Sequence, residues 1–124
     1  PVNMAGYVAS NIFNGDMKIF HWHDIKSLDP NKVTILDVRT EIEFSKGSIA
    51  GAVNIPVDDL RERILELEPK RPVYVFCQVG LRGYIASRIL IQNGFDNVYN
   101  LSGGYRLYKM ATTPLKPFRG SRLK

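Results

Sequence analysis

A lone cysteine stands among residue types that make a thiol reactive. After the apolar run Val73 to Phe76 the chain reads Cys77-Gln78-Val79-Gly80-Leu81-Arg82-Gly83, and a helical pattern begins at about Arg82. The thiol is therefore expected at the carboxyl end of a buried strand, facing a helix N-terminus. Free backbone N–H groups and the positive end of the helix dipole favour the thiolate, which is the nucleophilic form of cysteine. The pattern predicts nucleophilic chemistry at Cys77.

The residues around this cysteine predict an anionic ligand. Arg82 adds a fixed positive charge, and Gly80 and Gly83 let the backbone curl so that several N–H groups converge on one point. From Pro69 to Phe95 the chain carries four Lys and Arg residues and no carboxylate, which favours negatively charged partners. The simpler alternative is that Cys77 is a small buried hydrophobe. A core cysteine, however, requires neither the glycines nor the arginine.

Five apolar runs separated by helical patterns position the cysteine. The expected strands are 18–21, 33–38, 52–55, 73–76 and 98–101. The expected helical segments are a turn capped by Asp24, an amphipathic helix from Val57 to Leu67, and a helix from about Arg82 to Asn93-Gly94. Parallel neighbours require crossover connections, and those connections are helical here. The sequence therefore predicts an α/β fold with a parallel sheet.

Length and composition limit the classes of protein that remain. The chain has 124 residues, of which 44% are hydrophobic and 23% charged, as expected for one soluble domain. No apolar run approaches the ~20 residues of a membrane-spanning helix, and no signal peptide is visible. One cysteine excludes an intrachain disulfide and a cysteine-cluster metal site, which fits a reducing compartment. We therefore expect a cytoplasmic protein with no membrane partner and no bound metal.

The net charge of +5 does not indicate a nucleic-acid partner. Residues 1–113 hold 13 basic and 12 acidic residues, so most of the excess lies in the last residues of the chain. We expect these to form a solvated tail rather than a nucleic-acid arm.

Together, these segments resemble the rhodanese family. The loop from Cys77 to Gly83 is similar to the active-site loop of single-domain rhodaneses, which read Cys-x-x-Gly-x-Arg followed by a small residue. Three other signatures appear in order, as ILDVR at 35–39, GAVNIP at 51–56 and LSGGY at 101–105. The resemblance covers about residues 18–110 and implies a three-layer α/β/α rhodanese-like domain with a five-stranded, mainly parallel sheet. One departure is Ser48, which stands where the family usually has histidine and concerns the substrate cleft more than the chemistry.

The resemblance also implies a sulfurtransferase in which Cys77 carries the transferred sulfur as a persulfide. Cys77 and Arg82 are the implied catalytic residues. The implied substrate-binding residues are the rest of the loop, Gln78, Val79, Gly80, Leu81 and Gly83. Asp37 and Arg39 end a buried strand at the same edge, where they either line the cleft or form a charge pair that ties loops together. The implied partners are a small anionic sulfur donor and a thiol or cyanide acceptor, and no cofactor is implied in this chain.

The sequence also bears on two functions other than sulfur transfer. Protein tyrosine phosphatases and dual-specificity cell-cycle phosphatases use Cys-x5-Arg, whose larger loop surrounds a tetrahedral phosphate. Cys77 and Arg82 are spaced as Cys-x4-Arg, a smaller cradle that suits a terminal sulfur. The alternative from another class is a non-catalytic rhodanese-like module that binds a partner or senses redox state. Such modules usually lack the nucleophile or the loop arginine, and both are present here.

The N-terminal residues indicate a longer protein. Residues 1–11 are similar to the closing segment of the dimerisation domain in flavin-dependent coenzyme A disulfide reductases and related persulfide reductases. A local helix packing on its own domain is the alternative. Since the chain also begins with Pro1, we expect residues 1–16 to be the end of an upstream flavoprotein dimerisation domain or a linker, followed by a rhodanese domain at 17–111 and a basic tail at 112–124. FAD, NAD(P)H and coenzyme A are implied for the full-length protein.

Three further features carry structural expectations only. His21 and His23 lack a nearby third ligand, so a surface or packing role is expected rather than a metal site. Tyr84 is expected to pack in the first turn of the helix that follows the loop. Gly103-Gly104 is expected to form a turn where the backbone passes close to the rim of the site.

Overall fold

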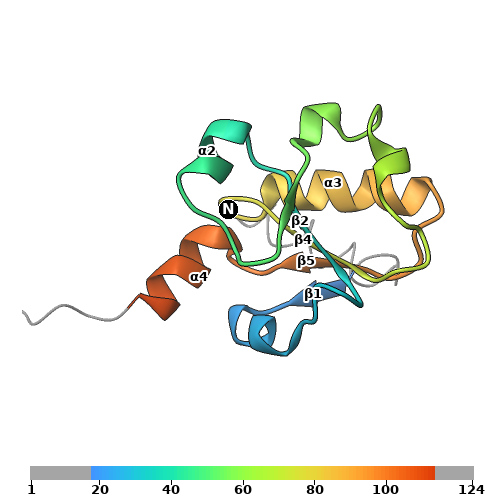
Figure 1. The fold of residues 1–124 in the computed structure, drawn as a ribbon. Coiled ribbons are helices and arrows are strands. Elements are labelled where there is room, and N and C mark those ends of the chain that lie inside the picture. The colour runs from blue at the N-terminus through green and yellow to red at the C-terminus, as the bar shows by residue number, and fades with distance from the viewer. Residues whose placement is uncertain (1–17, 114–124) are drawn as a thin grey trace, which may run out of the picture.

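A five-stranded parallel sheet forms the centre of the domain (Figure 1). The computed structural model describes residues 18–113. Its strands are β1 (Lys18–Phe20), β2 (Thr34–Asp37), β3 (Val53–Asn54), β4 (Val73–Phe76) and β5 (Val98–Leu101). They lie in the order β1-β5-β4-β2-β3, and every neighbouring pair runs parallel. The predicted parallel α/β sheet is confirmed, and the strands expected at 73–76 and 98–101 have the observed bounds.

Helical segments cover both faces of this sheet. They are the 3-10 helices η1 (Trp22–Ser27), η2 (Val57–Asp59) and η3 (Ile64–Glu66), and the α-helices α2 (Glu41–Ser45), α3 (Leu81–Gln92) and α4 (Gly104–Thr112). On one face α3 packs with η2, and on the other α4 packs with η1 (Figure 1). The expected three-layer arrangement is therefore observed. Within residues 18–113, none of the helices combines the length and the apolarity that crossing a membrane requires.

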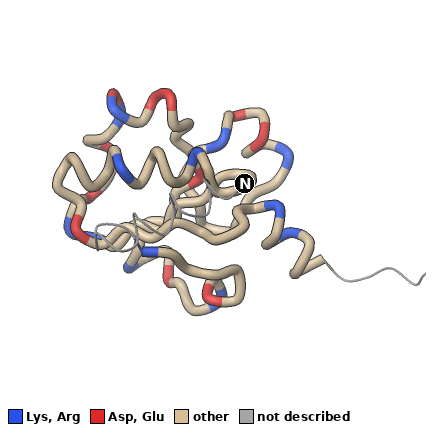
Figure 2. Tube along the Cα trace, turned by 180° about the vertical axis from the view of Figure 1, so that it is seen from behind, with Lys and Arg blue, Asp and Glu red and all other residues tan. Residues whose placement is uncertain are grey.

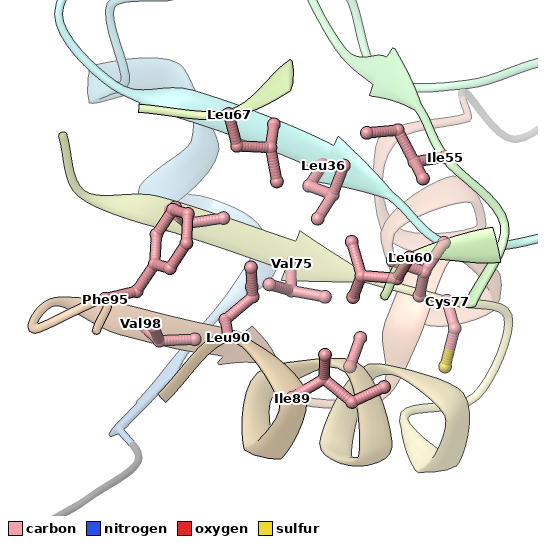
Figure 3. Close-up of a cluster of buried hydrophobic side chains, with 13 residues drawn as sticks. Leu36, Ile55, Leu60, Leu67, Val75, Cys77, Ile89, Leu90, Phe95 and Val98 are labelled. Carbon is pink, nitrogen blue, oxygen red and sulfur yellow. The ribbon is translucent and has the colours of Figure 1, made fainter. Parts of the chain in front are cut away.

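The alternation of β4 decides which layer the cysteine faces. Val73 and Val75 belong to the core cluster beneath α3, whereas Phe76 belongs to the cluster on the opposite face. Successive side chains of a strand point to opposite faces, so Cys77 falls on the α3 side. There it is fully buried beside Leu60 and the first turns of α3 (Figure 3).

The segment 57–67 is not the amphipathic helix that its pattern predicts, because it forms η2 and η3 joined by turns. Leu60 and Leu67 are buried, as the pattern required. Spacings of three and four residues suit 3-10 turns as well as an α-helix, so hydrophobicity alone does not distinguish the two. The Val57 N–H donates to the Val38 carbonyl at 3.0 Å, which ties the start of the segment to the end of β2.

Helices α2 and α4 were not anticipated. The sequence did contain the capping box that starts α2, in which the Thr40 hydroxyl accepts from the Glu43 N–H at 3.2 Å and the Glu43 carboxylate accepts from the Thr40 N–H at 3.0 Å. Helix α4 extends to Thr112, the first residue of the expected tail.

The cap of η1 also differs from expectation. Asp24 is not its N-cap, because His21 holds that position and donates its N–H to Asp24 at 3.0 Å. The expected upstream segment at 1–16 lies outside the described residues, as does the tail from residue 114 onward.

Candidate active site

Cys77 follows β4 directly and lies at the base of a loop that leads into α3. The Gly80 N–H points at the sulfur, with N and Sγ 2.9 Å apart. Gly80 is the N-cap of α3 and has a φ of +113°, a conformation that favours glycine. The sulfur thus accepts a hydrogen bond from the backbone at the N-terminus of α3. The predicted placement of the thiol at a strand end and a helix N-terminus is observed.

The start of α4 holds the cysteine loop by its carbonyl groups. The Tyr105 N–H donates to the Cys77 carbonyl at 2.7 Å, and the Arg106 N–H donates to the Gln78 carbonyl at 3.0 Å. N–H groups in the first turn of a helix have no acceptor within the helix. Here they find acceptors in the carbonyl groups of the loop. Gly104 permits this approach, because a Cβ there would lie 2.5 Å from the Gln78 oxygen. Gly103-Gly104 is thus the turn at the rim that the sequence led us to expect.

Asn100 is a second brace of the loop that sequence reasoning missed. Its Nδ2 donates to the Gly80 carbonyl at 3.1 Å, from a side chain that is itself buried in β5. Gly83 makes room for it, because a Cβ at that position would overlap the Asn100 Oδ1. The available signal was an amide side chain inside an otherwise apolar strand, where burial is costly unless it is hydrogen-bonded.

Arg82 is paired with Glu43, a residue that the sequence did not single out. Its Nη1 lies 2.8 Å from Oε1 and its Nη2 lies 3.1 Å from Oε2 of the carboxylate. The hydrogen bonds from Arg82, and then those from Thr40, hold the pKa of Glu43 at about 2 against an ordinary value of 4.5. The same pair raises the pKa of Arg82. Residues 69–95 contain no carboxylate, but in the folded domain α2 places the Glu43 carboxylate next to the loop.

The pair with Glu43 predicts an acid-dependent loss of stability. A carboxylate whose pKa is depressed by folding stabilises the native state above its ordinary pKa, and this contribution is lost as the pH falls toward 2. Both side chains are about one third exposed, so solvent screening limits the expected contribution to about 1 kcal/mol at neutral pH. We expect Glu43→Gln to lower the free energy of unfolding at pH 7, and the difference from the parent to shrink steadily below pH 4.5.

Urea unfolding between pH 7 and pH 2.5 measures this difference. Glu41→Gln removes the same charge from the same helix and serves as the matched control. Parallel pH profiles for the parent and Glu43→Gln would show that the ion pair does not contribute.

Asp37 and Arg39 form a buried ion pair that ties three loops together. The Arg39 Nη2 lies 2.8 Å from the Asp37 Oδ2, and the exposed fractions of the two side chains are 3% and 0%. The same guanidinium donates to the Gly47 carbonyl at 2.6 Å and to the Gln78 Oε1 at 3.3 Å. Ser48, at the family's histidine position, donates its hydroxyl to the Asp37 Oδ2 at 2.9 Å. Of the two roles expected for this pair, the structure shows the charge pair, and Arg39 also reaches the cleft beside Gln78.

A cleft of about 360 Å³ opens beside the loop, at the same edge of the sheet as Cys77. Its lining residues are Arg39, Glu43, Lys46, Gly47, Gln78, Tyr105 and Lys109. Of the loop residues expected to bind substrate, Gln78 lines this cleft. Val79 and Leu81 are exposed to solvent, while Gly80 and Gly83 are in the loop and the first turn of α3. Their substrate-binding role stays a prediction.

The remaining residues of interest lie elsewhere. The rings of His21 and His23 stack with their centroids 5.7 Å apart. Among residues 18–113 no group of three His, Cys, Asp or Glu side chains is placed to hold a metal ion. Tyr84 is buried in the first turns of α3, as expected.

The fold and the loop together define a three-layer α/β/α domain that presents its single thiol at the carboxyl edge of a parallel sheet. The profile of the rhodanese-like domain matches residues 24–111. The chain belongs to the rhodanese-like domain family, as the sequence resemblance implied.

Relatives whose names state an activity support the same assignment. The thiosulfate sulfurtransferase GlpE of Shewanella oneidensis is 32% identical over 87 residues, which cover 70% of this chain and 86% of that protein. The crystal structure of reduced Bacillus anthracis CoADR-RHD has a TM-score of 0.81 and 43% identity, and covers 88% of this chain and 19% of that one. An NAD-dependent persulfide reductase from A. fulgidus has a TM-score of 0.69 and 34% identity, with 86% and 18% coverage. The chain spans 60% and 24% of the length of the first two curated relatives it matches.

Proposed function

We propose that this protein is a sulfurtransferase that moves sulfane sulfur through a persulfide on Cys77. The observation that carries the proposal is the short contact between the Gly80 N–H and Sγ, in a loop whose carbonyl groups are held by Tyr105, Arg106 and Asn100. A loop held in this way keeps its N–H donor aimed at the sulfur during the chemical step, once the sulfur donor has bound. The similarity to a thiosulfate sulfurtransferase supports the same chemistry.

The proposed reaction has two substitution steps at sulfur. In the first, the Cys77 thiolate attacks the outer sulfur of an anionic donor such as thiosulfate, polysulfide or coenzyme A persulfide. The donor's S–S bond breaks, sulfite, a shorter polysulfide or the coenzyme A thiolate leaves, and Cys77 becomes a persulfide anion. In the second, cyanide or a thiolate attacks the outer sulfur and releases Cys77 as a thiolate. Neither step requires an external oxidant or reductant, because the acceptor takes up the same sulfane sulfur atom that the donor released.

Access to the sulfur requires movement. Cys77 has an exposed fraction of 0%, so a donor reaches Sγ only when the loop or its neighbours shift. The exposed residues Val79 and Leu81 lie on this loop, where displacement disturbs little of the core. Burial between turnovers would protect the persulfide from water and from stray thiols.

The proposed setting is a larger reductase acting on coenzyme A disulfides or persulfides. The similarity to CoADR-RHD and to the persulfide reductase supports it. The chain contains no Gly-x-Gly-x-x-Gly segment, so its residues do not fit a flavin or nicotinamide site of that type. FAD and NAD(P)H would therefore be held by the upstream flavoprotein domain, and no step at Cys77 is routed through them.

Intact-mass measurement tests the proposed function directly. After incubation with thiosulfate, the protein is expected to gain the mass of one sulfur atom, and cyanide is expected to remove it with formation of thiocyanate. Since Cys77 is the single cysteine of the chain, the added sulfur has one thiol on which to reside. No mass gain with thiosulfate, polysulfide or coenzyme A persulfide would favour the partner-binding or redox-sensing alternative, for which the complete burial of Cys77 is the supporting observation.

A further inference from the structure

The cleft beside the cysteine loop has two positive charges with no acidic partner. Lys46 follows α2 and Lys109 lies on α4, the two helices on either side of the loop that follows β4 (Figure 1). Both lysines line the cleft. Within the described part of the chain, neither ammonium group takes part in an ion pair. Figure 2 shows Lys and Arg on α4, a helix without a single Asp or Glu.

The other charged residues of the cleft cancel one another. The Arg82 Nη1 lies 2.8 Å from the Glu43 Oε1. The pKa of Glu43 is about 2, so its carboxylate is ionised and paired with Arg82 at neutral pH. Arg39 is held by Asp37 and lies over the Tyr105 ring, with Cζ 4.3 Å from the ring centroid. The uncompensated charge of the cleft is therefore that of Lys46 and Lys109. A concave surface with excess charge of one sign attracts ligands of the opposite sign.

The size of the cleft indicates a ligand larger than thiosulfate. Its volume of about 360 Å³ falls in the range of pockets that hold small organic molecules. Gln78, the residue after Cys77, lines the cleft, but Cys77 itself does not, so a ligand whose anionic group lies there needs several further bonds to bring its sulfur to Cys77.

We propose that this cleft binds the anionic group of a low-molecular-weight thiol, several bonds away from its sulfur. The site would then select thiols that carry a phosphate or carboxylate over neutral thiols of equal reactivity. This inference rests on the proposed function and names the class of its acceptor. In the selected step the acceptor thiolate attacks the outer sulfur of the Cys77 persulfide, the bond between the two sulfurs breaks, and the products are the acceptor persulfide and the Cys77 thiolate.

Acceptor kinetics test the selection. The protein is loaded with thiosulfate, and sulfur transfer is followed with coenzyme A, glutathione and 2-mercaptoethanol as acceptors. The variant K46Q/K109Q is expected to raise KM for coenzyme A about tenfold and to weaken its salt dependence, since two charge contacts at the surface are lost. KM for neutral 2-mercaptoethanol is expected to stay unchanged. Comparison of coenzyme A with glutathione shows whether phosphate or carboxylate is the better ligand.

The matched control is K32Q/K70Q, which removes two lysines from the segments that precede β2 and β4, at the opposite edge of the sheet. An equal rise of KM in both double variants, or an equal effect on the neutral thiol, would overturn the inference. Titration of coenzyme A onto unloaded protein separates this outcome from failure of the proposed function. Binding that K46Q/K109Q weakens supports the cleft even if no sulfur transfer occurs, and transfer without such binding refutes the cleft alone.

Discussion

Cys77→Ser is expected to reduce sulfur transfer to the uncatalysed background while the domain stays folded. A serine hydroxyl is not ionised at neutral pH and forms no persulfide, and the chain has no second thiol to replace Cys77. Loss of a nucleophile that forms a covalent intermediate typically costs a factor of at least about a thousand. The fold is expected to survive because the new hydroxyl can accept the Gly80 N–H that Sγ accepts now.

Thiocyanate formation from thiosulfate and cyanide measures the activity, and thermal unfolding measures the fold. Cys77→Ala is the companion variant, because it removes both the nucleophile and the acceptor of the Gly80 N–H. Both variants are expected to be inactive, and Cys77→Ala is expected to be the less stable if the contact at 2.9 Å stabilises the loop. Transfer that persists in either variant would show that the sulfur does not pass through Cys77.

The placement of this cysteine was predictable because it depends on local patterns. The run Val73 to Phe76 alternates valine with aromatic residues, and its observed bounds are those predicted. Gly80 was predicted to let the loop backbone curl, and in the structure it has a φ of +113°, a conformation that favours glycine. Strand, loop and helix follow one another without a gap in the chain. Short-range sequence was therefore sufficient to place the thiol at the end of a strand and to face it toward the N-terminus of a helix.

The residues that brace the loop were not predictable in the same way. Glu43 and Arg82 are 39 positions apart, and Asn100 reaches Gly80 across 20 positions. Each of these contacts depends on the order of the strands in the sheet, which hydrophobic periodicity does not encode. The helix expected at 57–67 failed for a different reason, because spacings of three and four residues suit the observed 3-10 turns as well as an α-helix. Contacts between segments that are distant in the sequence were therefore not predictable from the residues alone.

The largest expected effect on stability comes from Asp37→Asn. The substitution keeps the shape of the side chain but removes the charge that compensates Arg39, whose side chain is only 3% exposed. Removing one partner of a buried ion pair leaves an uncompensated charge and typically costs at least about 3 kcal/mol of unfolding free energy. Sulfur transfer should fall as well, because the same guanidinium connects to the Gly47 carbonyl and to Gln78.

Two further variants decide whether charge or shape is responsible. Ser48→Ala removes the hydroxyl that donates to Asp37 and is expected to cost about 1 kcal/mol, the usual value of one hydrogen bond. The double variant D37N/R39M removes both charges, so it is expected to regain a large part of the stability that Asp37→Asn loses. Urea unfolding of all four proteins at pH 7 provides the comparison. If the double variant is no more stable than Asp37→Asn, the cost arises from lost hydrogen bonds to the Asp37 carboxylate rather than from the uncompensated charge. If instead it recovers stability but not sulfur transfer, the buried pair serves mainly to hold Gln78 and the Gly47 loop against the cysteine, and charge neutrality alone does not replace that function.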